Sequence, residues 1–197
     1  MTDDAQLASH PIGLIVDDDL KRNRLTVFFR LLLAIPQLIW IVIWGIAAWL
    51  VLLASWIAAL IMGEVPEGMH NFNARFLRLN AHVNAYLFLL ADPWPPFMGE
   101  PGSYPVDLRV SPPAKQSRLT VFFRVLLAIP AFIVSYVFRL VNEIVAFLAW
   151  FYCLFTGRMH EGMRNLSAWM LRYEFQTHAY VFLLTGRYPS FEGSPTA

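Results

Sequence analysis

The sequence predicts an all-α membrane protein made of two tandem homologous repeats, and both its repetition and its composition lead to this fold class. The seven residues RLTVFFR stand at positions 24–30 and return at 118–124, a shift of 94 positions (118 − 24 = 94). Internal repetition fixes the architecture of a chain before other patterns are considered. The chain is 57% hydrophobic and 15% charged, whereas soluble domains are about half apolar and about a quarter charged.

The two repeats align without insertion or deletion, which sets the expected domain boundaries. The alignment extends from Pro11 and Pro105 to Gly99 and Gly193. We therefore expect a polar N-terminal tail over 1–9, a first membrane repeat over 10–99 and a second membrane repeat over 104–193. Two copies of one unit in a membrane chain are expected to be related by a pseudo-two-fold axis.

Each repeat opens with a short extended segment, residues 11–16 in the first copy and 105–110 in the second. The second copy alternates apolar and polar side chains, which is typical of a half-exposed strand. We expect two short strands that pair with each other.

A long apolar run follows in each repeat, and its length leaves two topologies open. Residues 31–62 contain no charged side chain. A continuous helix over this run would be about 48 Å long, against about 30 Å for the hydrocarbon core of a bilayer. The run is too long for one upright span and too short for two full spans of about 20 residues. The alternatives are a helical hairpin that bends near Gly45 and one long tilted helix after Pro36.

Charged residues favour the hairpin. The second apolar run is interrupted by Arg139, Asn142 and Glu143. A charge costs about 3 kcal/mol at the centre of a bilayer and little at a hairpin tip. Arg139 and Glu143 are four residues apart, so pairing along one continuous helix is the counter-argument. Arg139 is the one basic residue of fifteen inside an apolar run, and hairpins would keep the other fourteen on the cytoplasmic side, as the positive-inside rule prefers.

An amphipathic helix is predicted after Gly63 and again after Gly157, because glycine commonly ends a helix. Its apolar positions recur at steps of three and four residues. In the first copy they are Met69, Phe72, Phe76, Leu79, Val83, Tyr86 and Leu90. We expect this helix to lie in the membrane interface, with packing of the stripe on the protein's own helices as the open alternative.

These motifs resemble a bacterial membrane family known as domain of unknown function 4389. The matching signals are an Arg-Leu-Thr-x-x-Phe-Arg-x-x-x-x-Ile-Pro entry at 24–36, the glycine after the apolar run, Arg78 with Tyr86 in the following helix, and an aromatic-proline exit at 92–97. The resemblance covers almost the whole chain and both copies. It implies an integral membrane protein, and it implies no catalytic residue.

Arginines supply the candidate binding residues. Arg30 and Arg124 lie at the mouths of the two apolar runs. Arginine at such a depth snorkels to lipid phosphate, or it recognises an anionic headgroup or an acidic partner. The candidates for lipid or partner binding are Arg24, Arg30, Arg78, Arg118, Arg124 and Arg172.

Arg139, Asn142 and Glu143 form a second set, the candidate polar residues inside the membrane. At the midplane of the bilayer they would indicate a proton or ion pathway, and at a hairpin tip they would form only a loop. The first repeat lacks all three. We therefore expect any specialised role of this protein to depend on these three residues of the second repeat.

The sequence contains no signature of an enzyme or of a cofactor site. A phosphate-binding glycine loop, a Cys-x-x-Cys pair and a Gly-x-Ser-x-Gly elbow are absent. Glu67 and His70 have the spacing of a di-iron ligand pair, but Arg164 replaces the histidine in the second copy. The net charge of +1 gives no basis for nucleic-acid binding. We expect no catalysis, cofactor, metal or nucleic acid.

The sequence is therefore interpreted as a non-catalytic integral protein of the inner (cytoplasmic) cell membrane, with its N-terminus and inter-repeat link on the cytoplasmic side. The expected role is an accessory or scaffold subunit that binds lipid headgroups and a partner membrane complex. The expected partners are membrane lipids and either a membrane protein complex or further copies of this chain in a homo-oligomer. The alternative is a small oligomeric transporter or channel that uses the repeat interface. A transporter would direct Arg139, Asn142, Glu143 or Ser135 towards a shared cavity, whereas a scaffold would have a dry interface.

Overall fold

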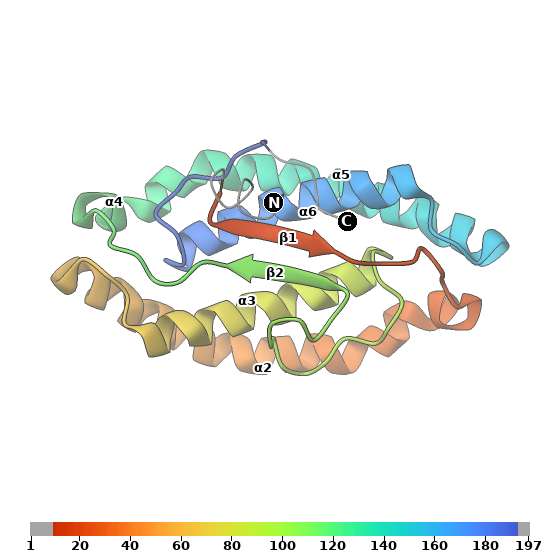
Figure 1. Ribbon diagram of the computed structural model, residues 1–197, viewed down its shortest axis with the longest axis horizontal. Helices are drawn as coiled ribbons and strands as arrows, with labels where there is room; N and C mark the ends of the chain where they lie inside the picture. The colour runs from red at the N-terminus through yellow and green to blue at the C-terminus, as the bar shows by residue number, and fades with distance from the viewer. Residues whose placement is uncertain (1–9, 193–197) are drawn as a thin grey trace.

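Two long helices form the back layer of the molecule, as the computed structural model of residues 10–192 shows (Figure 1). They are α2 (Arg24–Met62) and α5 (Arg124–Thr156), and the short helix α4 (Arg118–Phe122) precedes α5. The predicted tail over 1–9 and the end of the second repeat at 193 lie outside the described residues.

Two shorter helices and a small sheet complete the layers. The middle layer holds α3 (Glu67–Leu87) and α6 (Glu161–Val181), and the strands β1 (Ile12–Val16) and β2 (Val106–Val110) lie in front (Figure 1). Strand β2 packs mainly on α3 and β1 on α6. The mostly helical fold of two tandem repeats is therefore confirmed.

The predicted pairing of the two strands is also confirmed, and its register carries the symmetry of the molecule. The strands are antiparallel, and Leu14 pairs with Leu108 at the centre of the sheet. These two residues are the same position of the repeat, since 14 + 94 = 108. A two-stranded antiparallel ladder centred on equivalent residues has its two-fold axis normal to the sheet. The pseudo-two-fold axis therefore runs through the three layers.

The expectation of a helical hairpin in each apolar run is wrong. Helix α2 continues without a break for 39 residues and α5 for 33 residues. Gly45 is a helical residue, and a Cβ added to it would lie 3.6 Å from the ring of Phe76 on α3. This is an ordinary contact distance, and the glycine lies within α2 and does not form a turn. The single long helix, the alternative topology, is the one observed.

Each long helix ends at the predicted glycine. Gly63 has φ 81° and Gly157 has φ 72°, a left-handed conformation that glycine adopts without a steric penalty. The long helices run antiparallel to each other, and equivalent hydrogen bonds join α2 to α4 at one end and to α5 at the other. Trp56 Nε1 donates to the carbonyl oxygen of Val121 at 3.0 Å, and Trp150 Nε1 donates to that of Val27 at 2.8 Å.

The amphipathic helices pack largely inside the molecule. On α3 the stripe residues Leu79, Val83 and Tyr86 are buried by protein atoms, and so are Asn73 and His82 on the opposite face. Sequence periodicity identified the stripe correctly, but the sheet and the neighbouring helices cover both faces of the helix. The stripe therefore packs on the protein's own elements, and the position of these helices relative to a membrane interface stays a prediction.

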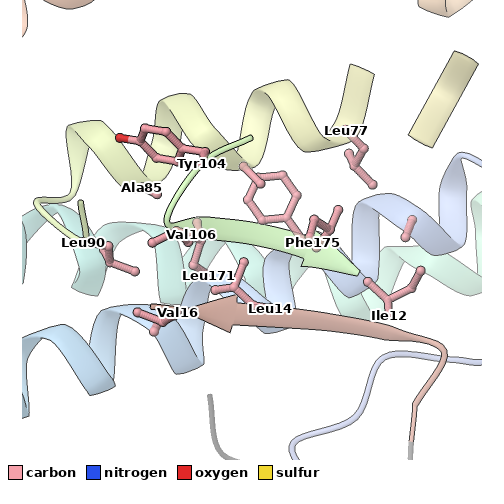
Figure 2. Close-up of a cluster of buried hydrophobic side chains, with 14 of the residues drawn as sticks. Ile12, Leu14, Val16, Leu77, Ala85, Leu90, Tyr104, Val106, Leu171 and Phe175 are labelled. Atoms are coloured by element: carbon pink, nitrogen blue, oxygen red, sulfur yellow. The ribbon is translucent and has the colours of Figure 1, made fainter. Parts of the chain in front are cut away.

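The main hydrophobic core lies between the sheet and the middle helices. Leu14, Val16 and Val106 point from the strands towards Leu171 and Phe175 on α6 (Figure 2). Burial of apolar area is the dominant favourable contribution to folding. Because this core is built from the sheet, α3 and α6, the outer faces of α2 and α5 are left free of it.

The segment between α3 and β2 packs directly on α3, and Gly99 is the point of closest approach. A Cβ on Gly99 would lie 1.8 Å from the carbonyl oxygen of Arg75 and 2.7 Å from the backbone nitrogen of Leu79. We predict that Gly99→Ala lowers the free energy of unfolding by about 1–3 kcal/mol, the usual effect of overpacking. The measurement is thermal unfolding in detergent micelles.

Gly68→Ala is the matched control for this substitution. Gly68 lies in the first turns of α3 and has open space around its Cα. Alanine is the better helix former, so this variant is expected to unfold at the same temperature as the natural protein or slightly above it. Equal destabilisation by both substitutions would contradict the close packing of Gly99 on α3.

Candidate functional site

Arg30 and Arg124, the two arginines at the mouths of the apolar runs, are both buried. Each makes the same hydrogen bonds to backbone carbonyl oxygens of its own repeat. The Nη1 atom of Arg30 donates to the carbonyl oxygens of Tyr86 at 2.6 Å and Ala91 at 3.0 Å. Arg124 Nη1 donates in the same way to those of Tyr180 and Thr185, both at 2.7 Å.

Each of these arginines also lies over an aromatic ring and has a polar partner on its second nitrogen. Arg30 lies 4.3 Å from the ring centroid of Tyr86, and its Nη2 donates to Asp92 at 3.0 Å. Arg124 lies 4.3 Å from the ring of Tyr180. Both arginines are only 2% exposed, so neither guanidinium is open to a lipid phosphate. Their geometry indicates that they hold the end of the shorter helix against the long one.

Arg24 and Arg118 are exposed, and they lie at opposite ends of the slab. Arg24 Nη2 donates to the carbonyl oxygen of Phe155 at 3.0 Å, in the last turn of α5. Arg118 lies beside Gly63, where α2 ends. A cation at the C-terminus of a helix interacts favourably with the helix dipole. Each repeat thus supplies the basic residue at the helix end of the other repeat, and both side chains remain accessible to an anion.

Arg78 and Arg172 attach irregular and extended segments to the middle helices. Arg78 Nε donates to the carbonyl oxygen of Leu108 at 2.9 Å, and Arg172 Nη2 donates to that of Phe191 at 3.2 Å. Burial lowers the pKa of both guanidinium groups from their ordinary value. The backbone contacts point to a role in holding β2 and the C-terminal segment in place.

Asp107 on β2 lies in the same polar cluster as Arg78. Its carboxylate is 3.2 Å from His82 Nε2 and 3.8 Å from Arg78 Nε. Burial alone raises the pKa of Asp107, but hydrogen bonds from His82 and from the backbone of Gly102 and Leu108 outweigh burial and hold the pKa below its ordinary value. The group therefore stays ionised near neutral pH and anchors the sheet to α3.

Arg139, the basic residue inside the second apolar run, joins the two repeats. Its Nη1 donates to Glu174 on α6 at 2.8 Å and to Asn84 on α3 at 2.9 Å. Its Nε lies 3.5 Å from Glu143, and its guanidinium lies 5.1 Å from the ring of Phe88. The charge is thus paired with residues from three helices, which explains why it does not require a hairpin tip in water.

Ser135 and Asn142, two further polar residues of α5, are buried. Ser135 donates to Thr177 on α6 at 2.9 Å. Asn142 is 1% exposed, and both polar atoms of its side chain lack a protein partner. A buried amide without a partner is uncommon and costs free energy. Asn142 is therefore the strongest candidate on α5 for a bound water or a polar ligand atom inside the molecule.

A cavity of about 440 Å³ lies beside Arg139 and Glu143, between α2, the end of α3 and α5. Its apolar lining includes Leu31, Phe88 and Phe147. Volumes of this size are typical of pockets for small ligands, with an apolar lining and a few polar groups. The unshared charged pair thus borders an apolar pocket between the repeats, and an amphiphile fits this chemistry.

The largest surface feature is the outer face of α2 and α5. Both helices are long and apolar enough to cross a membrane by length and composition. Large apolar side chains are exposed along their whole length: Leu25, Leu31, Ile39, Val42, Ile46, Leu50, Ile57 and Ile61 on α2, and Val125, Ile133, Tyr136, Ile144, Phe147 and Phe155 on α5. Soluble monomers rarely expose contiguous apolar patches above a few hundred Å².

Glu174 is the site residue that the sequence reading missed. In the aligned repeats, Glu174 replaces Asn80 and Arg139 replaces Gly45. The second repeat thus has two opposite charges at positions where the first repeat has uncharged residues. This difference is the sequence signal that could have indicated the Arg139–Glu174 ion pair. Within residues 10–192 no group of His, Cys, Asp and Glu side chains is placed to hold a metal ion.

We predict that Arg139 couples more strongly to Glu174 than to Glu143. The Glu174 side chain is 9% exposed and that of Glu143 is 56% exposed, and an exposed pair contributes less than about 1 kcal/mol. Double-mutant cycles with Gln at each position should give about 1–3 kcal/mol for the buried pair. Unfolding in detergent measures both cycles, and the Glu143 cycle is the matched control. Equal coupling energies would contradict the geometry.

Comparison with known sequences gives a family. The sequence model of the domain of unknown function DUF4389 matches residues 24–99 and 118–192, one match for each repeat. Together the two matches cover more than half of the chain, so the chain belongs to this family. No curated protein and no solved structure matches the chain significantly.

Proposed function

We propose that this member of the DUF4389 family is a non-catalytic protein of the cytoplasmic membrane that binds lipids and serves as an accessory subunit for a partner membrane complex. The observation that carries the proposal is the exposed apolar face of α2 and α5. Transfer of one Leu, Ile or Phe side chain out of water contributes about 1.5–3 kcal/mol, so a face of this length binds strongly to hydrocarbon.

Basic side chains at both ends of this face support contact with lipid headgroups. Arg24 and Arg118 are exposed there, and a basic residue near an anionic membrane surface contributes about 1 kcal/mol. Trp94 and Phe97 are also exposed beside α2, and aromatic rings favour the depth of the headgroups. The apolar face with a basic and aromatic border is the pattern of a membrane-bound surface.

The alternative function is a small oligomeric transporter or channel, and one observation favours it. Asn142 is buried, and both polar atoms of its side chain lack a protein partner. However, Arg139 donates to Asn84 of the first repeat and to Glu174 of its own repeat, so the charged group that reaches between the repeats is already paired within the protein. These contacts support the accessory subunit over the transporter.

The first test of the proposal is membrane retention. The full chain, produced in bacterial cells, is expected to remain in the membrane fraction after washes with high salt and alkaline carbonate, and to enter solution only with detergent. Release by the washes alone would contradict burial of the apolar face in lipid.

Lipid selectivity is the second test, and it isolates the contribution of Arg24 and Arg118. Quenching of tryptophan fluorescence by brominated phosphatidylglycerol, compared with brominated phosphatidylcholine, measures the preference for anionic lipid. The double variant Arg24→Gln/Arg118→Gln should lose about 2 kcal/mol of this preference, or about 30-fold in relative affinity.

Lys21→Gln/Lys115→Gln is the control with the same loss of charge. Lys21 and Lys115 are also equivalent positions of the two repeats (21 + 94 = 115), and both are exposed. They precede the long helices, so their replacement is expected to change the preference for anionic lipid much less. An equal loss in both double variants would show that only net charge matters and would refute headgroup contact by the two arginines.

A further inference from the structure

We infer that α2 and α5 lie parallel to the plane of the membrane, embedded in one leaflet, and that neither helix crosses the bilayer. In this arrangement the pseudo-two-fold axis is the membrane normal, the outer faces of α2 and α5 contact acyl chains, and the sheet faces water. The inference rests on the proposed membrane location and defines the surface that meets the lipid.

Helices α2 and α5 are too long to cross the hydrocarbon core at the usual tilt of a spanning helix. Helix α2 has 39 residues and α5 has 33, which correspond to about 58 Å and about 50 Å at 1.5 Å per residue. A hydrocarbon core of about 30 Å would enclose α2 only at a tilt of about 60°, whereas spanning helices are tilted by at most about 40°. The length of both helices therefore disfavours a crossing orientation.

An upright orientation of α2 would also place other segments of the protein within the bilayer. Helix α3 runs beside α2, from the contact of Tyr86 with Arg30 to that of Asn73 with Ser55. Strand β2 lies over the middle of α3, where Arg78 binds the backbone of Leu108. An upright α2 would therefore place α3 and the sheet at the midplane of the bilayer.

That position is costly for both side chains and backbone. Arg75, Arg78 and Asp107 would lie at membrane depth, and each charge there costs about 3 kcal/mol. The segment 92–105 between α3 and β2 has no helical or strand structure, and irregular backbone facing lipid is not tolerated in the hydrocarbon region. An in-plane orientation leaves these groups on the water side.

The distribution of charge on the back layer agrees with contact to acyl chains. Helix α2 has no charged residue from 31 to 62. Between 125 and 156 the only charged residues of α5 are Arg139 and Glu143, which lie 3.5 Å apart. Pairing lowers the cost of bringing these two charges near lipid. Within residues 10–192, the remaining charged residues lie at the helix ends, on the middle helices, on the sheet or on the connecting segments.

The symmetry of the two repeats also favours the in-plane orientation. Because the axis is normal to the sheet, both repeats present their long helix to the same side of the slab (Figure 1). If the helices crossed the bilayer, the same axis would lie in the membrane plane and the repeats would be inverted, with basic residues divided between two compartments. An in-plane pair keeps all basic residues on one side, which the positive-inside rule favours.

Sidedness of two equivalent positions tests the inference directly. Glu64 follows α2 and Arg158 follows α5 (64 + 94 = 158), at opposite ends of the slab, and both are exposed. Single variants Glu64→Cys and Arg158→Cys in a Cys153→Ala background are labelled with an impermeant maleimide, in intact cells and again in permeabilised cells. The in-plane arrangement predicts the same result at both positions, namely labelling from the same side of the membrane.

Labelling of the two positions from opposite sides would overturn the in-plane arrangement and leave the proposed membrane function intact. Recovery of the full chain outside the membrane fraction would contradict both proposals. Spin labels at Leu25, Ile46 and Ile61 on the outer face of α2 give a second readout. Their depths should agree within about 5 Å in the plane of one leaflet, whereas Ile46 would lie about 15 Å deeper than the other two in a spanning helix.

Discussion

The antiparallel pairing of one strand with its own copy is the constraint on which the rest of the structure depends. Because Leu14 meets Leu108 at the centre of the ladder, every element of the first repeat has its counterpart across an axis normal to the sheet. The middle helices then lie side by side, and the long helices run antiparallel behind them. One hydrogen-bonded register thus decides which faces of the helices are covered and which stay free.

Residues that the two repeats share and residues that they do not share serve different purposes. Shared arginines such as Arg30 and Arg124 bind backbone carbonyl oxygens within their own repeat and hold its helices together. The unshared Arg139 reaches across the interface to Asn84, and the cavity beside it is lined by residues of both repeats. The shared residues therefore build the scaffold of each repeat, and the unshared Arg139 links one repeat to the other.

Much of the fold could be predicted from the sequence, because repetition, glycine helix ends and apolar periodicity are local signals. The hairpin was wrong because the spacing of charges was interpreted under the assumption that the apolar run crosses a bilayer. Glu174 supplies a partner for Arg139 inside the protein, and no local pattern reveals a contact between residues 35 positions apart. The burial of Arg30 is missed for the same reason, since its partners lie in the last turn of the next helix and just after it.

The angle between the helices and the membrane normal distinguishes the in-plane arrangement from a crossing one. Helices α2, α3, α5 and α6 all run along the long axis of the molecule (Figure 1). The helical signal of the whole chain therefore gives one mean angle between these helices and the membrane normal. Polarised infrared spectroscopy of the full chain in supported bilayers measures that angle from the amide I dichroism. The account predicts a mean angle near 90° to the normal, and a mean angle below about 40°, as in spanning helices, would contradict it.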